Sequence, residues 1–104
     1  MAAERGNAAL AGLLGEEARG PVLALIAAVV AAADAHGRWV GVCGELAGDP
    51  EAAVQLAGLG VAELSMAASR IPAVKAALRA VDLEAARSAA RSALPQGGAT
   101  PGAR

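Results

Sequence analysis

Aromatic residues are almost absent from this chain of 104 residues, which has one tryptophan, Trp39, and neither phenylalanine nor tyrosine. Without a row of aromatic rings, the chain lacks a surface on which the bases of single-stranded nucleic acid could stack. An excess of charge of one sign is absent too, because the formal net charge is −1 and the basic residues are scattered. We therefore expect neither nucleic acid nor an anionic membrane surface among the partners of this protein.

Cysteine is represented by Cys43 alone, which excludes an internal disulfide and a metal site built from several cysteines. Long apolar runs are also absent. The longest uncharged apolar run covers residues 22–33, and as a helix it would rise about 18 Å, against a hydrocarbon core of about 30 Å. This run follows Glu16 and Glu17 and lies too far into the chain for a secretory signal. We expect a cytoplasmic protein that does not span a membrane.

Bulky apolar side chains are few relative to alanine, so a core built from this sequence consists of Ala, Leu and Val. Alanine buries little area, and the hydrophobic stabilisation of a domain of this size and composition is correspondingly small. The composition favours a single domain that packs against further protein.

Hydrophobic periodicity predicts six elements in the order helix, strand, helix, strand, helix, helix. The first helix covers residues 21–35, and its predicted apolar face consists of Val22, Leu25, Ile26, Val29, Val30 and Ala33. The other elements are a strand at 39–42, a helix at 51–57, a strand at 61–66, and helices at 71–81 and 84–94. Residues 95–104 are rich in glycine and proline and are predicted to be a disordered tail.

Short polar signals mark the helix ends. Asp49, Ser69 and Asp82 are predicted to cap the second, third and fourth helices. His36 and Gly37 are predicted to end the first helix, and the second is predicted to stop near Gly58 and Gly60. Asp49 is thus interpreted as a helix cap rather than a catalytic acid.

Strands separated by helices of this length pair in parallel through right-handed crossovers. The strand at 39–42 is too short and apolar to be exposed on both faces. Two parallel strands would also both be edges with unpaired backbone groups. The pattern therefore predicts part of a larger α/β sheet or barrel.

Cys43 follows the first predicted strand and is flanked by glycine residues. A single thiol in this position is either a small buried hydrophobic group or a reactive group directed at a ligand. Gly41 and Gly44 allow close backbone approach and a tight turn around it.

Four segments carry a recognisable pattern: Gly-Val-Cys-Gly-Glu-Leu-Ala-Gly-Asp at 41–49, Gly-Leu-Gly-Val at 58–61, Glu-Leu-Ser-Met at 63–66 and Ile-Pro at 71–72. Together they resemble the C-terminal end of enzyme I, the family of phosphoenolpyruvate–protein phosphotransferases of the bacterial sugar phosphotransferase system. Arg5-Gly6-Asn7 is similar to the Asp-Arg-Gly-Asn segment of that family, with Glu4 in place of the aspartate. The resemblance extends over residues 3–94.

The resemblance implies an α/β fold made of the last two βα units of a (β/α)8 TIM barrel, incomplete on its own. Residues 1–94 would form the C-terminal part of this domain of phosphoenolpyruvate (PEP)-utilising enzymes, followed by the tail at 95–104. Active sites of such barrels lie at the C-terminal ends of the strands, which is where Cys43 is predicted.

In this family, PEP passes its phosphoryl group to a histidine on a separate N-terminal domain and then to a phosphocarrier protein. The enolate left behind becomes pyruvate when it receives a proton. Cys43 matches the family's proton donor, and an ordinary thiol, with a pKa of about 8.5, is mostly protonated at neutral pH. Arg5 matches the arginine that binds the phosphate of PEP. Gly44 and Glu45 are candidates for orienting the thiol.

The resemblance also implies Mg²⁺ in the intact enzyme and a homodimer. The metal ligands of the family match no residue of this chain, so no metal-binding residue is predicted on it and the chain alone is expected to be inactive. Two other interpretations stay open. One is a non-catalytic remnant that acts as a structural or interaction module. The other is a fragment of a pyruvate phosphate dikinase or PEP synthase, against which the segments Glu45–Gly48 and Leu64–Met66 argue.

Overall fold

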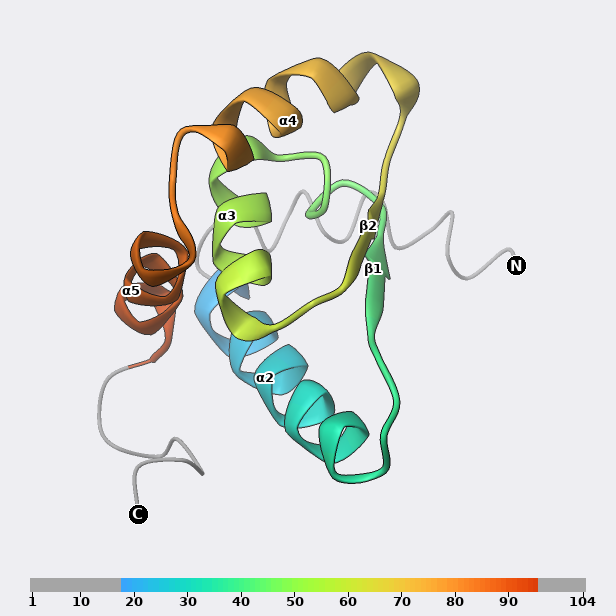
Figure 1. Ribbon diagram of the computed structural model, residues 1–104, viewed down its shortest axis with the longest axis vertical. Helices are drawn as coiled ribbons and strands as arrows, with labels where there is room; N and C mark the ends of the chain where they lie inside the picture. The colour runs from blue at the N-terminus through green and yellow to red at the C-terminus, as the bar shows by residue number, and fades with distance from the viewer. Residues whose placement is uncertain (1–17, 96–104) are drawn as a thin grey trace.

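The computed structural model describes residues 18–95 (Figure 1). It contains the predicted order of helix, strand, helix, strand, helix and helix, with one additional 3₁₀ turn. The elements are α2 (Arg19–Ala35), β1 (Gly41–Cys43), α3 (Pro50–Leu59), β2 (Glu63–Ser65), η2 (Ala68–Arg70), α4 (Ile71–Arg79) and α5 (Leu83–Ala93). None of the helices within this range is long and apolar enough to cross a membrane.

The two strands pair in parallel, as the sequence predicts, and α3 forms the connection between them. Gly41 lies opposite Glu63, Val42 opposite Leu64 and Cys43 opposite Ser65. The ends of both strands differ from the predicted ones by one or two residues. β1 begins at Gly41 and includes Cys43, against the predicted 39–42, and β2 lies within the predicted 61–66. Cys43 therefore ends its strand rather than following it.

One face of this two-stranded sheet is uncovered in the described part of the chain. Its residues are Gly41, Cys43, Glu63 and Ser65, all exposed, and we call this set the open face. Val42 and Leu64 point to the opposite face and are half-buried, since alternate residues of a strand point to opposite sides. In Figure 1, α2, α3 and α5 all lie to one side of the strands. The prediction that the first strand is not exposed on both faces is confirmed, because the face of Val42 is half-buried and only the face of Gly41 and Cys43 is exposed.

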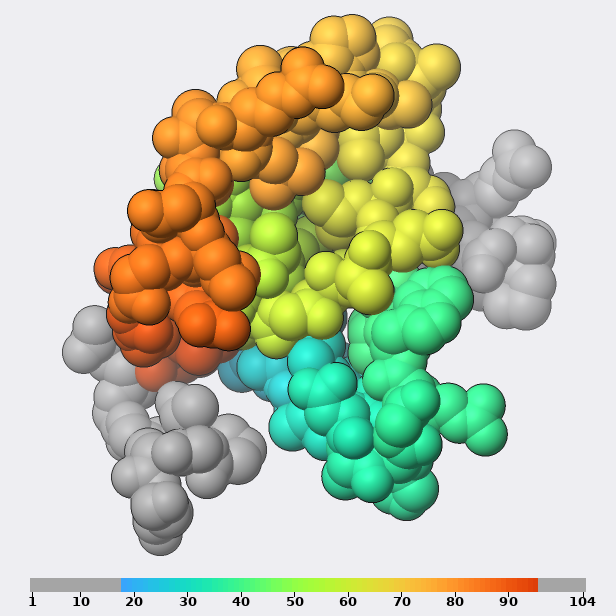
Figure 2. Space-filling model, in the orientation of Figure 1, coloured from blue at the N-terminus to red at the C-terminus, as the bar shows by residue number. Residues whose placement is uncertain are grey.

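Helix α3 is the centre of the packing. It contacts α5 most extensively and also α4 and α2. Figure 2 shows α4 and α5 as an orange-to-red band that curves around α3. In the described part of the chain the buried hydrophobic residues are, as predicted, Ala, Leu and Val, namely Leu23, Val30, Ala47, Ala52, Ala53, Leu56, Val74, Ala86 and Ala90.

The buried face of α2 differs from the predicted one. Leu23 is fully buried, although it was not part of the predicted apolar face, whereas Leu25 is 67% exposed and Val29 is 47% exposed. Nearly every position between 22 and 33 is apolar, so periodicity alone does not distinguish the faces. The position of α3 and α5 relative to α2 decides which residues are buried.

The predicted caps of α3 and α5 are confirmed, and that of α4 is wrong. The Asp49 carboxylate accepts a hydrogen bond from the Ala52 amide at 3.2 Å, and Asp82 accepts one from Ala85 at 2.8 Å. Ser69 lies instead within η2, and α4 follows Arg70 without a side-chain cap. The first helix begins at Arg19, two residues earlier than predicted.

The predicted end of α2 is confirmed, and of the two glycines predicted near the end of α3, Gly60 is at its end whereas Gly58 lies within the helix. His36 is the C-cap of α2, and Gly60 is the C-cap of α3 in the left-handed conformation, at φ 103°. Apart from Pro95, the predicted tail lies outside the described residues, and so does Arg5.

Gly58 allows α3 and α5 to approach each other closely. A Cβ atom at this position would overlap the backbone carbonyl group of Ala86 and lie 2.9 Å from the amide nitrogen of Arg87. Backbone atoms cannot move aside as a flexible side chain does. The absence of a side chain at Gly58 is therefore what permits the largest helix contact of the domain.

We expect the substitution Gly58→Ala to lower the free energy of unfolding by about 2 kcal/mol, because overpacking a close contact forces the two helices apart. In a helix without this contact, the same change would stabilise the protein by about 1 kcal/mol, so the sign is diagnostic. Urea unfolding followed by circular dichroism measures the effect.

The matched control is Gly37→Ala, where a Cβ atom meets nothing within 4 Å but φ is 68°. This change should cost only the backbone strain, about 1 kcal/mol. A Gly58→Ala protein at least as stable as the parent would contradict the close approach of α3 and α5.

Candidate functional site

Cys43 lies at the C-terminal end of β1, directly opposite Ser65 at the C-terminal end of β2. Its side chain is exposed and forms part of the open face. The alternative that Cys43 is a small buried hydrophobic residue is therefore wrong for this chain. The thiol is free to meet a ligand at the carboxyl edge of the sheet.

The loop that follows Cys43 is a compact turn. Gly44 adopts φ 104°, a conformation that favours glycine, and its amide donates a hydrogen bond to the Ser65 carbonyl at 3.1 Å. The Gly48 amide donates to the carbonyl oxygens of Gly44 and Glu45, at 3.3 and 3.2 Å. The predicted tight turn at Gly44 is thus confirmed, and it directs the chain away from the thiol.

The last part of the loop is fixed by packing. Ala47 and Gly48 are buried. A Cβ atom at Gly48 would lie 3.4 Å from Cβ of Met66 and 3.3 Å from Cγ of Arg70. Met66, which belongs to the Glu-Leu-Ser-Met segment, is therefore half-buried against this loop. Its role in the site is to support the loop from the side of β2.

Glu45 is exposed, and its side chain makes no hydrogen bond or ion pair with another residue of the range 18–95. A salt bridge within the loop would explain Glu45 without a functional role, and no such salt bridge is observed between residues 18 and 95. Its predicted function in orienting the thiol remains a prediction.

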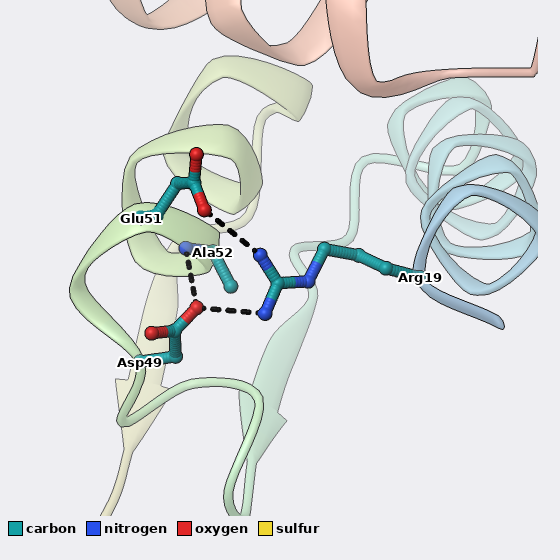
Figure 3. Close-up of polar contacts among 4 residues, drawn as sticks. All are labelled: Arg19, Asp49, Glu51 and Ala52. Atoms are coloured by element: carbon teal, nitrogen blue, oxygen red, sulfur yellow. Dashed lines mark hydrogen bonds and ion pairs between the residues drawn. The ribbon is translucent and has the colours of Figure 1, made fainter. Parts of the chain in front are cut away.

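Arg19 connects the start of α2 to the start of α3, and Figure 3 shows its guanidinium group between two carboxylates. One nitrogen lies 2.9 Å from the Asp49 carboxylate and another lies 3.2 Å from that of Glu51. The same Asp49 oxygen also accepts the capping hydrogen bond from Ala52. The Arg19 side chain is only 20% exposed.

This cluster holds the far end of the loop that begins at Cys43. The near end is held by the Gly44–Ser65 hydrogen bond, so both ends of the segment are attached to the rest of the domain. Sequence analysis did not find Arg19, because it is 30 residues from Asp49 and no local pattern joins the two.

Other predicted site residues are not brought together by the described residues. Arg5 lies outside the described range, so its proximity to Cys43 is untested. His36, which is predicted as a helix end and not as a site residue, is at the end of α2, where its Nδ1 atom lies 3.0 Å from the carbonyl of Ala32. Between residues 18 and 95, no group of three or more His, Cys, Asp or Glu side chains is arranged to hold a metal ion.

Comparison with known proteins gives a family match over residues 1–83, to the PEP-binding domain of PEP-utilising enzymes. The chain is 48% identical over 94 residues to a phosphoenolpyruvate-protein phosphotransferase of Haloferax volcanii, covering 90% of this chain and 16% of that protein. It is 56% identical over 73 residues to a multiphosphoryl transfer protein of Xanthomonas campestris, covering 70% of this chain and 9% of the relative. For multiphosphoryl transfer protein 1 of Escherichia coli K12 the identity is 49% over 71 residues, covering 68% of this chain and 8% of the relative. The chain thus spans less than a fifth of the length of these relatives.

We expect a double-mutant cycle between Arg19→Gln and Asp49→Asn to give a coupling free energy of about 0.5–1 kcal/mol at low salt. Asparagine retains the ability to cap a helix, so the cycle isolates the ion pair. In about 1 M NaCl, where the screening length is about 3 Å, the coupling should fall. Urea unfolding of the four proteins measures it.

The control cycle is Arg91→Gln with Glu84→Gln, an ion pair of 3.4 Å whose side chains are 63% and 75% exposed. Its coupling should be smaller, because both groups are surrounded by water. Equal couplings in the two cycles would contradict the proposed anchoring by Arg19.

Proposed function

Because the chain belongs to the family of PEP-utilising enzymes, within their PEP-binding domain, we propose that it acts as part of a PEP–protein phosphotransferase. The resemblance to enzyme I agrees with the name of the Haloferax volcanii relative. The observation that carries the proposal is the exposed thiol of Cys43 at the carboxyl end of β1, within the segment that carries the resemblance.

In the proposed reaction, Cys43 supplies the proton that completes pyruvate. Loss of the phosphoryl group from PEP leaves an enolate, whose methylene carbon is nucleophilic. The S–H bond of Cys43 breaks, a C–H bond forms at this carbon, and the enolate oxygen becomes a carbonyl. The thiolate then recovers a proton from solvent. In the reverse direction the thiolate acts as the base.

The substrate-binding role is assigned to Arg5. A guanidinium group is planar and permanently charged, so it can bond two phosphate oxygens at once and offset charge on the transferring group. Glu45 follows Cys43 by two positions and is exposed, and we assign it the role of orienting the thiol. Gly44 contributes by turning the backbone away from the thiol.

The proposed context is a TIM barrel of which this chain supplies the last two βα units. Support comes from the open face, which bears Cys43 and would point to the barrel interior, and from the parallel pairing of β1 and β2. The phosphorylated histidine and the contact with a phosphocarrier protein would belong to another domain, and the complete enzyme would be a cytoplasmic homodimer that serves sugar uptake.

Mg²⁺ is the cofactor that the resemblance implies. The described residues do not fit a magnesium site, since no three candidate ligands are grouped among them. No step of the proposed mechanism is therefore assigned to the metal on this chain.

A chimera tests the role of Cys43. The matching 94 residues of this chain replace those of the Haloferax volcanii enzyme, to which they are 48% identical. In this chimera, Cys43→Ser should slow the formation of pyruvate from PEP by about 100-fold or more, because serine is a far weaker acid than a thiol. A coupled assay for pyruvate measures the rate.

The matched control for this experiment is Ser88→Ala, an exposed position on α5, which should leave the rate unchanged. A Cys43→Ser chimera that forms pyruvate at the parental rate would overturn the assignment of the proton donor.

We also expect the chain alone to form no pyruvate from PEP, even with Mg²⁺ and a phosphocarrier protein present. The reason is that no phosphorylated histidine or metal site has been assigned to it. The same coupled assay, with the chimera as the positive control, measures this, and turnover by the purified chain would show that residues 1–104 suffice.

A further inference from the structure

The open face carries a second feature, at the end of the strands opposite to Cys43. A shallow hollow of about 360 Å³ lies there, lined by Trp39, Ala62 and Glu63. The Ala62 amide donates a hydrogen bond to the carbonyl of Val40 at 2.9 Å, which joins the two chain segments that line the hollow. Trp39 and Ala62 lie just before β1 and β2, and Glu63 begins β2, so the hollow lies at the amino ends of the two strands.

Gly41 lies close to two of the side chains that line this hollow. A Cβ atom at Gly41 would lie 3.2 Å from Oε1 of Glu63 and 3.5 Å from Cζ3 of Trp39. The carboxylate and the indole ring thus approach the same point on the sheet, and the absence of a side chain at Gly41 keeps that point open. An aromatic ring and a negative charge lie together around it.

The two groups are available for a ligand. Trp39 is 68% exposed and Glu63 is exposed. The ion pairs within residues 18–95 join Arg19 to Asp49 and Glu51, and Arg91 to Glu84, and none involves Glu63. A carboxylate beside an indole ring is suited to a guanidinium group, whose plane stacks on the ring while its N–H groups bond both carboxylate oxygens.

We propose that the Trp39–Glu63 hollow receives an arginine side chain from an extended segment that lengthens the sheet. The proposal rests on the proposed function in one respect, since the open face would then point to the interior of a barrel. There Glu63 would be removed from water, and a buried carboxylate without a cationic partner is strongly unfavourable. Free backbone groups along the edge of a two-stranded sheet provide the pairing for such a segment.

Trp39 is the only aromatic residue of the chain, so its fluorescence reports on the hollow directly. The probe is an acetylated and amidated seven-residue peptide of alternating Val and Thr with a central arginine. Its partner peptide has glutamine at the centre. We expect the arginine peptide to change the emission of Trp39 with half-saturation at an about tenfold lower concentration, as one charge-assisted contact implies.

Two variants show whether Glu63 causes this preference. In Glu63→Gln, the ratio between the two peptides should fall to about one, while circular dichroism confirms the parental fold. The matched control is Asp34→Asn, which removes an exposed negative charge from α2 and should preserve the preference.

Three results would overturn the proposal: equal half-saturation by the two peptides, no change of emission with either, or a preference that persists in Glu63→Gln. None of these affects the pyruvate assay of the chimera, because that assay reads the proton transfer at Cys43. Failure of the hollow and failure of the proposed function are therefore distinguishable.

Discussion

Parallel pairing of two three-residue strands determines the rest of the candidate site. Because β1 and β2 run in the same direction, their carboxyl ends meet at one edge, where Cys43 faces Ser65. Because alternate residues of a strand point to opposite faces, Gly41 and Glu63 lie on the same face of the sheet as the thiol. A shift of one residue in either strand would exchange the two faces and direct the thiol toward the helices.

The helices support this arrangement with small side chains. Within residues 18–95, five of the nine buried hydrophobic residues are alanine, and Gly58 brings the backbones of α3 and α5 into direct contact. Small residues allow close packing of helices but bury little apolar area, so each contact contributes little hydrophobic free energy. Among residues 18–95 the helices lie on one side of the sheet, which leaves the open face uncovered by this part of the chain. A chain built in this way is suited to pack against further protein, as expected of part of a larger domain.

The loop after Cys43 is held without a large apolar anchor. Backbone hydrogen bonds fix the turn between Gly44 and Gly48, and the Arg19–Asp49 ion pair fixes the start of α3. A half-buried ion pair of this kind is modest in free energy but directional, so it restrains the position of the loop more than it stabilises the domain. The exposed thiol is thus presented by a short, restrained segment between two secondary-structure elements.

The sequence by itself determined the features that depend on short-range chemistry. The order of the elements, the caps at Asp49 and Asp82, the left-handed end of α3 at Gly60 and the segment around Cys43 are all encoded within a few consecutive residues. Tertiary structure alone decided that Leu23 rather than Leu25 is buried, that the open face stays uncovered, and that Arg19 meets Asp49 from 30 residues away. The physical reason is that an apolar or charged side chain has no preferred partner until the packing of other elements brings one within reach.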